Sequence, residues 1–153
     1  MKKTIILFLV LTMLSSLAAC GRTPSAKALL SDFLSVYSVE GVIYSPDKSI
    51  GEDGYVYDGL MERIYVYEGD FPRDYAILLN SRLSDFSECG VFVCESDNER
   101  EAVEEMCAER IRLLLGGREG GLLMRSGRIV FYSTLEDSER CESVFRKIIR
   151  AYS

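Results

Sequence analysis

The alternation of apolar and polar residues from residue 75 onward predicts two successive ββα units. Apolar runs typical of strands occupy residues 75–79, 86–94, 122–125 and 128–132. Apolar residues at helical spacing follow each pair of runs, at residues 102–115 and 141–152. We therefore predict an α+β domain in which residues 75–152 form a mainly antiparallel sheet with helices packed on one face.

Local signals place the boundaries of these elements. Ser96–Glu99 and Ser133–Glu136 have the spacing of capping boxes, which predicts a helix start after each. Ser126-Gly127 is a two-residue connection typical of a hairpin. Residues 91–94 are apolar on both faces, which favours a central strand.

The chain before residue 75 is less regular. Thr23 as N-cap and Pro24 as first helical residue predict a helix over about residues 24–38. Short strands are indicated at 41–44 and 55–57. For residues 60–69 we favour a helix, with a strand at 64–67 as the alternative.

The N-terminus has the build of a secretory signal peptide. Lys2 and Lys3 precede an apolar segment from Ile5 to Leu14, and small residues follow. The uncharged stretch from Thr4 to Ala19 is 16 residues long. That length is short of the roughly 20 residues that cross a bilayer as a helix.

The residues Leu17, Ala18, Ala19 and Cys20 resemble the lipobox of bacterial lipoproteins. The resemblance implies that Cys20 receives a diacylglyceryl thioether, carrying acyl chains such as palmitate, and becomes the first mature residue. It divides the chain into a signal peptide (1–19), a lipidated cysteine with a short tether (20–23) and one exported domain (24–153) on the extracytoplasmic side of the cell membrane. The alternatives are an ordinary cleaved signal with Cys20 as a plain thiol, or a retained span with a cytoplasmic domain.

The layout also resembles small lipoproteins of a domain-of-unknown-function family common in anaerobic Gram-positive bacteria. The similarity is carried by the lipobox, by 74–79 and 88–93 ahead of a long helix, and by the closing strand and helix at 127–152. It implies an exported, membrane-tethered α+β domain and supplies no catalytic residues.

Composition and charge narrow the function classes. The 153 residues suit one domain, and the net charge is −6. Without Lys2 and Lys3, 24 acidic side chains oppose 16 basic ones, a net charge of −8. This charge argues against nucleic-acid binding, and it would repel anionic lipid from a domain without an anchor. The absence of histidine removes the usual catalytic triads and most zinc sites.

Several residue groups have both a functional and a structural interpretation. Four cysteines follow the anchor, and we favour buried hydrophobes over disulfides or a metal site: Cys89, Cys94, Cys107 and Cys141. Acids that suggest a calcium loop, but more simply a solvated one, stand at Asp47, Glu52, Asp53 and Asp58. Six of the nine tyrosines lie between residues 44 and 75, where we favour packing over a binding surface.

The remaining candidate site is basic. Arg118, Arg125 and Arg128 would form one anion-binding patch if the hairpin tip lay beside the C-terminal end of the preceding helix. We therefore expect a non-enzymatic lipoprotein without cofactor or metal. Its expected partners are membrane lipid, through Cys20, and an envelope protein or anionic cell-wall polymer. The alternatives are a lipid-anchored hydrolase that uses carboxylates and a thiol-redox envelope lipoprotein.

Overall fold

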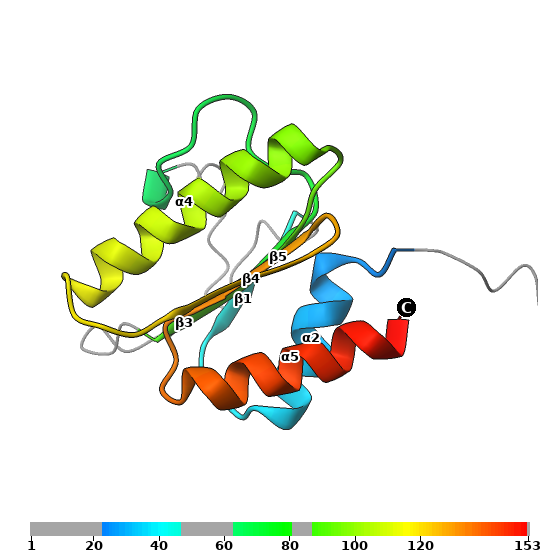
Figure 1. Cartoon of the computed structure of the whole chain (residues 1–153), viewed down its shortest axis with the longest axis vertical. Coiled ribbons are helices and arrows are strands. Elements are labelled where there is room, and N and C mark those ends of the chain that lie inside the picture. The colour runs from blue at the N-terminus through cyan, green and yellow to red at the C-terminus, as the bar shows by residue number, and fades with distance from the viewer. Residues whose placement is uncertain (1–22, 47–62, 81–86, 153) are drawn as a thin grey trace, which may run out of the picture.

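Among the residues that the structure describes, five antiparallel strands form one sheet and three helices pack against it (Figure 1). The computed structural model describes residues 23–46, 63–80 and 87–152. The strands, in sheet order, are β1 (Val42–Tyr44), β2 (Tyr75–Leu79), β3 (Glu88–Val93), β5 (Ile129–Ser133) and β4 (Leu122–Ser126). The helices are α2 (Ala26–Val36), α4 (Asp97–Leu115) and α5 (Ser138–Tyr152). The predicted α+β class, with an N-terminal helix and an antiparallel sheet, is confirmed.

Both predicted ββα units are present, as β2-β3-α4 and β4-β5-α5. Strand β5 lies between β3 and β4, so the two units share a single sheet. The β4-β5 hairpin turns at Gly127-Arg128, one residue later than predicted, because Ser126 still pairs with Ile129. Gly127 has a φ of +57°, a left-handed conformation that glycine adopts at little cost.

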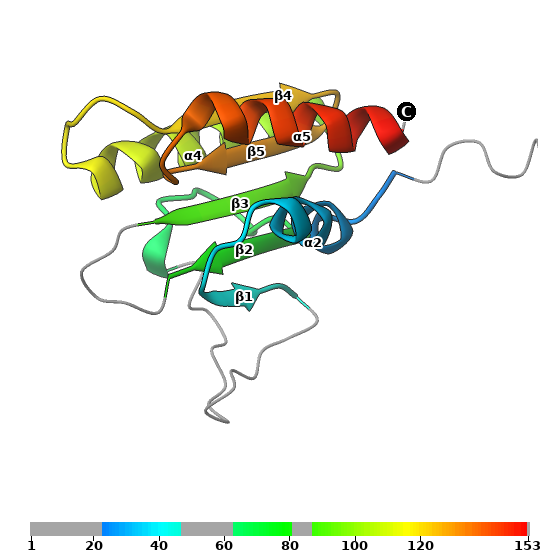
Figure 2. The same cartoon turned by 90° about the horizontal axis from the view of Figure 1, so that it is seen from below.

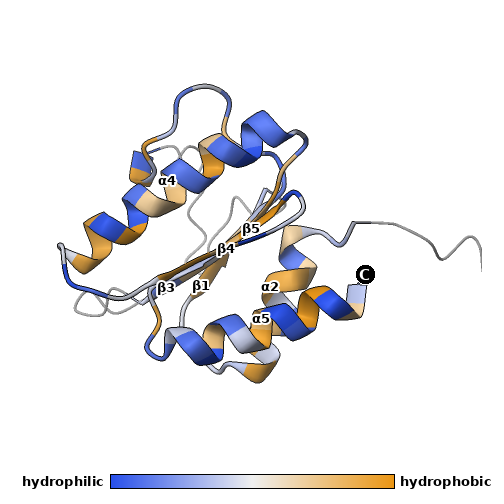
Figure 3. Ribbon diagram, in the orientation of Figure 1, coloured by the Kyte–Doolittle hydropathy of each residue, from blue (hydrophilic) through white to orange (hydrophobic). Residues whose placement is uncertain are grey.

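The helices cover both faces of the sheet, so the prediction that they pack on one face is wrong. Helices α2 and α5 lie on one face and α4 on the other (Figure 1, Figure 2). Every residue of β5 is buried, and so are five of the six residues of β3. A single helical layer would leave one apolar side of these strands in water. Figure 3 shows hydrophobic colour along the sheet and hydrophilic stretches on the helices.

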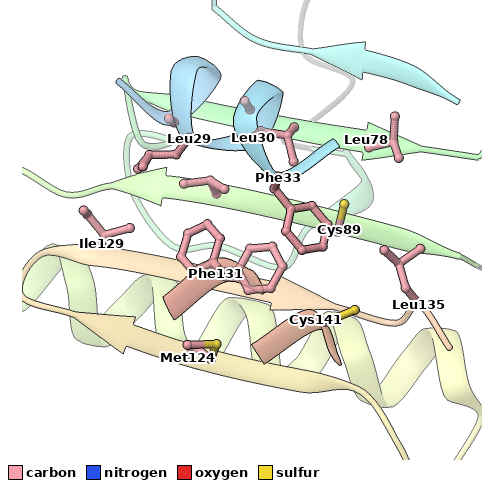
Figure 4. Close-up of a cluster of buried hydrophobic side chains, with 14 residues drawn as sticks. Leu29, Leu30, Phe33, Leu78, Cys89, Met124, Ile129, Phe131, Leu135 and Cys141 are labelled. Atoms are coloured by element: carbon pink, nitrogen blue, oxygen red, sulfur yellow. The ribbon is translucent and has the colours of Figure 1, made fainter. Parts of the chain in front are cut away.

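Three phenylalanine rings pack together in the core under α2 and α5, among aliphatic and sulfur-containing side chains (Figure 4). Phe131 of β5 stacks on Phe145 of α5 with ring centroids 4.1 Å apart. Phe33 of α2 lies 5.0 Å from Phe131, and all three side chains are at most 1% exposed. These contacts hold both helices against the sheet, because they remove a large apolar area of each ring from solvent.

The core under α4 is formed by Val103, Met106 and Cys107 of that helix against the opposite side of the same strands. Gly90 of β3 makes room for Tyr132, since a Cβ at Gly90 would lie 2.5 Å from the Tyr132 ring. The strand residues alternate between the two cores, as the period of two in an extended chain requires.

The start of α2 lies further along the chain than predicted. Ser25, not Thr23, is the N-cap, and its hydroxyl accepts from the Ala28 N–H at 3.3 Å. The Ala26 N–H donates to the Asp74 carboxylate at 3.0 Å, which ties the helix to the beginning of β2. Pro24 therefore precedes the helix.

One of the two predicted capping boxes begins a helix. The Ser96 hydroxyl caps α4 by accepting from the Glu99 N–H at 3.1 Å. Ser133 instead ends β5, and its hydroxyl accepts from the Leu135 N–H. Before α5, the Asp137 carboxylate accepts from the Arg140 N–H at 3.0 Å, so the prediction of a box at 133–136 is wrong.

Residues 65–67 are neither helix nor strand, so both interpretations of this stretch are wrong for them. Arg63 and Ile64 are helical, and Tyr65 then turns into the core under α4 with its ring edge-on to Phe92. Packing of one buried ring decides the local backbone here, rather than a periodic pattern. The predicted strand at 55–57, the start of the 60–69 segment and the acidic loop residues 47–58 lie outside the described residues.

Candidate functional site

The predicted lipidation site lies before the first residue that the structure describes. Leu17, Ala18, Ala19 and Cys20 lie outside the described residues, so lipidation stays a prediction. Within the described ranges, no helix is both long and apolar enough to span a bilayer. The first described residue, Thr23, follows Cys20 by three positions.

The three arginines predicted to form one patch do not lie together, because Arg118 and Arg128 are at opposite ends of α4. The Arg118 Nε donates to the Leu115 carbonyl at the C-terminal end of the helix, at 3.0 Å. The Arg128 Nη1 donates to the Glu95 carbonyl, just before the N-terminal end, at 2.7 Å. The helix has 19 residues, a length of about 28 Å. The predicted position of the hairpin tip is therefore wrong, because β4 carries the chain back along α4.

Arg125 instead borders a groove between the edge of the sheet and α5. It reaches the groove from the edge strand, because its Cβ, like that of its cross-strand partner Val130, lies on the α4 face of the sheet. The groove has a volume of about 200 Å³, and its lining residues are Met124, Arg125, Ser126, Arg146, Ile149 and Arg150. Strand β4 is outermost on its side of the described sheet, so the groove opens at a strand edge. We call this the arginine groove.

The arginine groove combines an apolar base with basic side chains. Met124 is 9% exposed and belongs to the core under α2 and α5, and Ile149 packs against that core. Arg146 is held by Glu142, whose Oε1 accepts from Nε at 2.8 Å. Neither Arg125 nor Arg150 makes an ion pair with any residue that the structure describes. Counting Glu142, the groove carries a net charge of +2, whereas residues 20–153 together carry a net charge of −8.

The sequence held a signal for this groove that the prediction missed. Arg146 and Arg150 are four residues apart, so they lie on one face of α5 beside Ile149. The apolar spacing at 141–152 by itself predicts only a helix. What the sequence alone does not reveal is that β4 lies against this part of α5, because that contact follows from the order of the strands.

A second polar cluster lies under α4, where Glu88, Tyr65 and Tyr132 are buried and Arg110 is partly buried. The Glu88 carboxylate receives two bonds from Arg110, from Nε at 3.0 Å and from Nη2 at 2.6 Å. The hydroxyls of Tyr65 and Tyr132 each donate to Glu88 Oε1, and their two oxygen atoms lie in close contact with each other. Glu88 is 3% exposed, and the Arg110 guanidinium also lies over the Tyr65 ring at 5.4 Å.

The pKa shifts in this cluster follow from burial and from the Glu88 charge. Burial, and then the nearby carboxylate, raise the pKa of Tyr65 well above 10. Burial, and then Tyr65 and Glu88, do the same for the pKa of Tyr132. Burial alone would lower the pKa of Arg110, but its bonds to Glu88 and the charge of that group raise it. Both tyrosine hydroxyls are therefore protonated donors at pH 7. Arg110 forms a two-bond ion pair with Glu88, so the cluster joins α4 to β3 and β5.

The four cysteines of the domain are free and buried, which confirms the interpretation as small hydrophobes. Cys89 and Cys141 belong to the core under α2 and α5, whereas Cys94 and Cys107 belong to the core under α4. Burial raises the pKa of the Cys94 thiol to about 12, with the charge of Glu99 adding to the effect. A protonated, buried thiol is a poor nucleophile. The described part of the chain contains no group of three or more cysteine or acidic side chains placed to hold a metal ion.

Comparison of the chain with protein-family models, with curated proteins and with solved structures gives no match.

Proposed function

We propose that this chain is a lipid-anchored extracytoplasmic protein whose single domain binds an anionic component of the cell envelope in the arginine groove. The observation that carries the proposal is the N-terminal sequence, a basic start, an apolar segment and Leu17-Ala18-Ala19-Cys20. Two acyl chains on Cys20 would anchor the protein stably, where one chain gives marginal binding. The proposal assigns the domain no catalytic step.

The binding half of the proposal is supported by the charges in the groove. Arg125 and Arg150 are exposed and lack ion-pair partners among the described residues, and the arginine fork matches carboxylate and phosphate oxygens. By contrast, the buried charge at Glu88 is already matched by Arg110. Among the described residues, the guanidinium groups of Arg125 and Arg150 are therefore available to bind an external anion, whereas Arg110 is already paired with Glu88.

The anchoring half is tested by replacing the acylated atom. We expect Cys20→Ser to abolish incorporation of labelled fatty acid and to weaken membrane partition of the full chain. Arg22→Gln, two residues further along and outside the lipobox, is the matched control and should keep both. If Cys20→Ser stays labelled and membrane-bound to the same extent as the parent, the anchor is not at this residue.

A further inference from the structure

The arginine groove lies at the end of the domain from which the chain runs back to Cys20. The Ala26 N–H at the start of α2 bonds to the Asp74 carboxylate, and the Asp74 carbonyl accepts from Val93. Val93 pairs with Ile129, which pairs in turn with Ser126 at the border of the groove. One line of contacts thus joins the beginning of α2 to the groove.

The helices give the same result independently. The Tyr37 hydroxyl, just after α2, bonds to the Glu136 carbonyl just before α5. The Tyr152 hydroxyl at the end of α5 bonds to Asp32 of α2 at 2.8 Å. The two helices are therefore antiparallel, and the C-terminal part of α5, with Arg150, lies toward the beginning of α2. Figure 1 and Figure 2 show the start of α2, the C-terminus and the β4-β5 turn on one side of the molecule.

The remaining length of chain limits how far this end lies from the anchor. Thr23 follows Cys20 by three residues, and three extended residues span at most about 11 Å. A lipid on Cys20 would therefore hold this end of the domain, and the groove with it, close to the headgroups of the membrane.

We propose that the arginine groove binds the phosphate headgroup of an anionic phospholipid in the membrane that carries the anchor. This inference rests on the proposed lipidation of Cys20. The volume of the arginine groove, about 200 Å³, is below the 300–1,000 Å³ typical of pockets that enclose a whole small molecule, and it suits one phosphate group. Met124 and Ile149 at its base provide apolar contact for the carbon atoms next to that phosphate.

The acidic surface of the domain explains why such a site would need the anchor. A domain with a net charge of −8 is repelled by an anionic surface, so the groove alone would bind weakly. A short tether raises the effective concentration of headgroups to the order of millimolar or more, enough to fill a weak site. Occupation of the groove would then orient the domain, with the β4-β5 turn toward the lipid and the Arg118 end of α4 away from it.

The test uses the full chain as purified, in a neutral detergent, with arginine Nε–H NMR signals as the readout. The probes are dihexanoyl phosphatidylglycerol, dihexanoyl phosphatidylcholine and inorganic phosphate. We expect phosphatidylglycerol to shift the signals of Arg125 and Arg150 at concentrations where the other two probes do not. In Arg125→Gln/Arg150→Gln, binding should weaken about 25-fold, at about fivefold for each arginine. Arg125→Lys/Arg150→Lys keeps the charge without the fork and should bind at an intermediate strength.

The matched control removes two charges from the opposite end. Arg112→Gln/Arg118→Gln alters the net charge equally, at residues whose contacts lie within α4 and its C-terminal end. It should bind phosphatidylglycerol as the parent does. Equal weakening in both double variants would show a general charge effect, equal binding of inorganic phosphate would show an anion site without lipid preference, and no shift would show no site. Each of these three results overturns the proposal.

The detergent experiment does not depend on acylation, so its outcome is separable from that of the anchor. A second readout is hydrogen exchange of the chain reconstituted in phosphatidylcholine vesicles with or without 30% phosphatidylglycerol. We expect phosphatidylglycerol to slow exchange in residues 122–128 and 146–152 of the parent only, not of the Gln double variant. If Cys20 is acylated but exchange is unchanged, the anchor holds and the lipid site is wrong.

Discussion

At the residue scale, the least expected feature is the buried pair of Glu88 and Arg110. Glu88 lies in a strand that the sequence pattern predicts correctly, yet nothing in that pattern distinguishes it from a solvent-facing acid. Its partner is 22 positions away in α4, and the two tyrosines that complete the cluster come from a loop and from β5. Such a cluster depends on contacts between distant parts of the chain, which local periodicity does not contain.

Removing one partner of this pair should cost far more than removing a surface pair. We expect Arg110→Met to lower the free energy of unfolding by about 3 kcal/mol, because it leaves a buried carboxylate without its counter-charge. Arg112→Met, next to it on α4 but exposed and paired with Glu109, should leave the free energy of unfolding nearly unchanged. Urea denaturation measures both. A similar loss in the two variants would mean that Arg110 contributes only helix packing.

The buried thiols and phenols predict a loss of stability in alkali. The pKa of Cys94 is raised from 9.0 to about 12, so the unfolded chain releases this proton at a lower pH than the folded one. The resulting stabilisation is complete below pH 9 and is lost as the pH rises through about 12; the raised pKa values of Tyr65 and Tyr132 add a loss that begins above pH 10. Urea denaturation of the reduced protein at pH 8 and pH 11 should show this decline, and Cys94→Ala should make it shallower. Identical slopes would contradict the role of Cys94.

At the scale of elements, the sequence predicts what depends on neighbouring residues and misses what depends on the far side of the sheet. The four strands after residue 75, the hairpin and the two long helices follow from periods of two and 3.6, and all are present. The position of α4 on the second face was not predicted, although the apolar residues on both sides of 91–94 already required a second cover. The sequence pattern does not predict the groove either, because the contact of β4 with α5 depends on the order of the strands, in which β5 lies between β3 and β4.

The start of α2 tests how the N-terminal end of the domain is built. Ser25→Ala should lower the free energy of unfolding by about 1 kcal/mol, since its hydroxyl satisfies the Ala28 N–H. Thr23→Ala should have little effect, because Thr23 lies outside the helix. Thermal or urea unfolding of the two variants distinguishes the caps. The reverse order of effects would place the helix start at Thr23.

At the scale of the molecule, the position of the arginines is more informative than the net charge. A chain with net charge −8 after residue 20 is a poor ligand for anionic surfaces as a whole. Its fold nevertheless places Arg125, Arg146 and Arg150 in one groove at the end that leads to Cys20. The anchor and the groove together would hold the domain in one orientation, in which the rest of its acidic surface faces away from the membrane.

We propose above that Cys20 carries lipid and begins the mature chain. Intact-mass and peptide mass spectrometry of the protein isolated from the membranes of its own host distinguish a lipidated Cys20 from an unmodified one. We expect the N-terminal peptide to begin at Cys20 and to carry a diacylglyceryl group on its sulfur. A mature chain that begins elsewhere, or a Cys20 with an unmodified thiol, would contradict the claim.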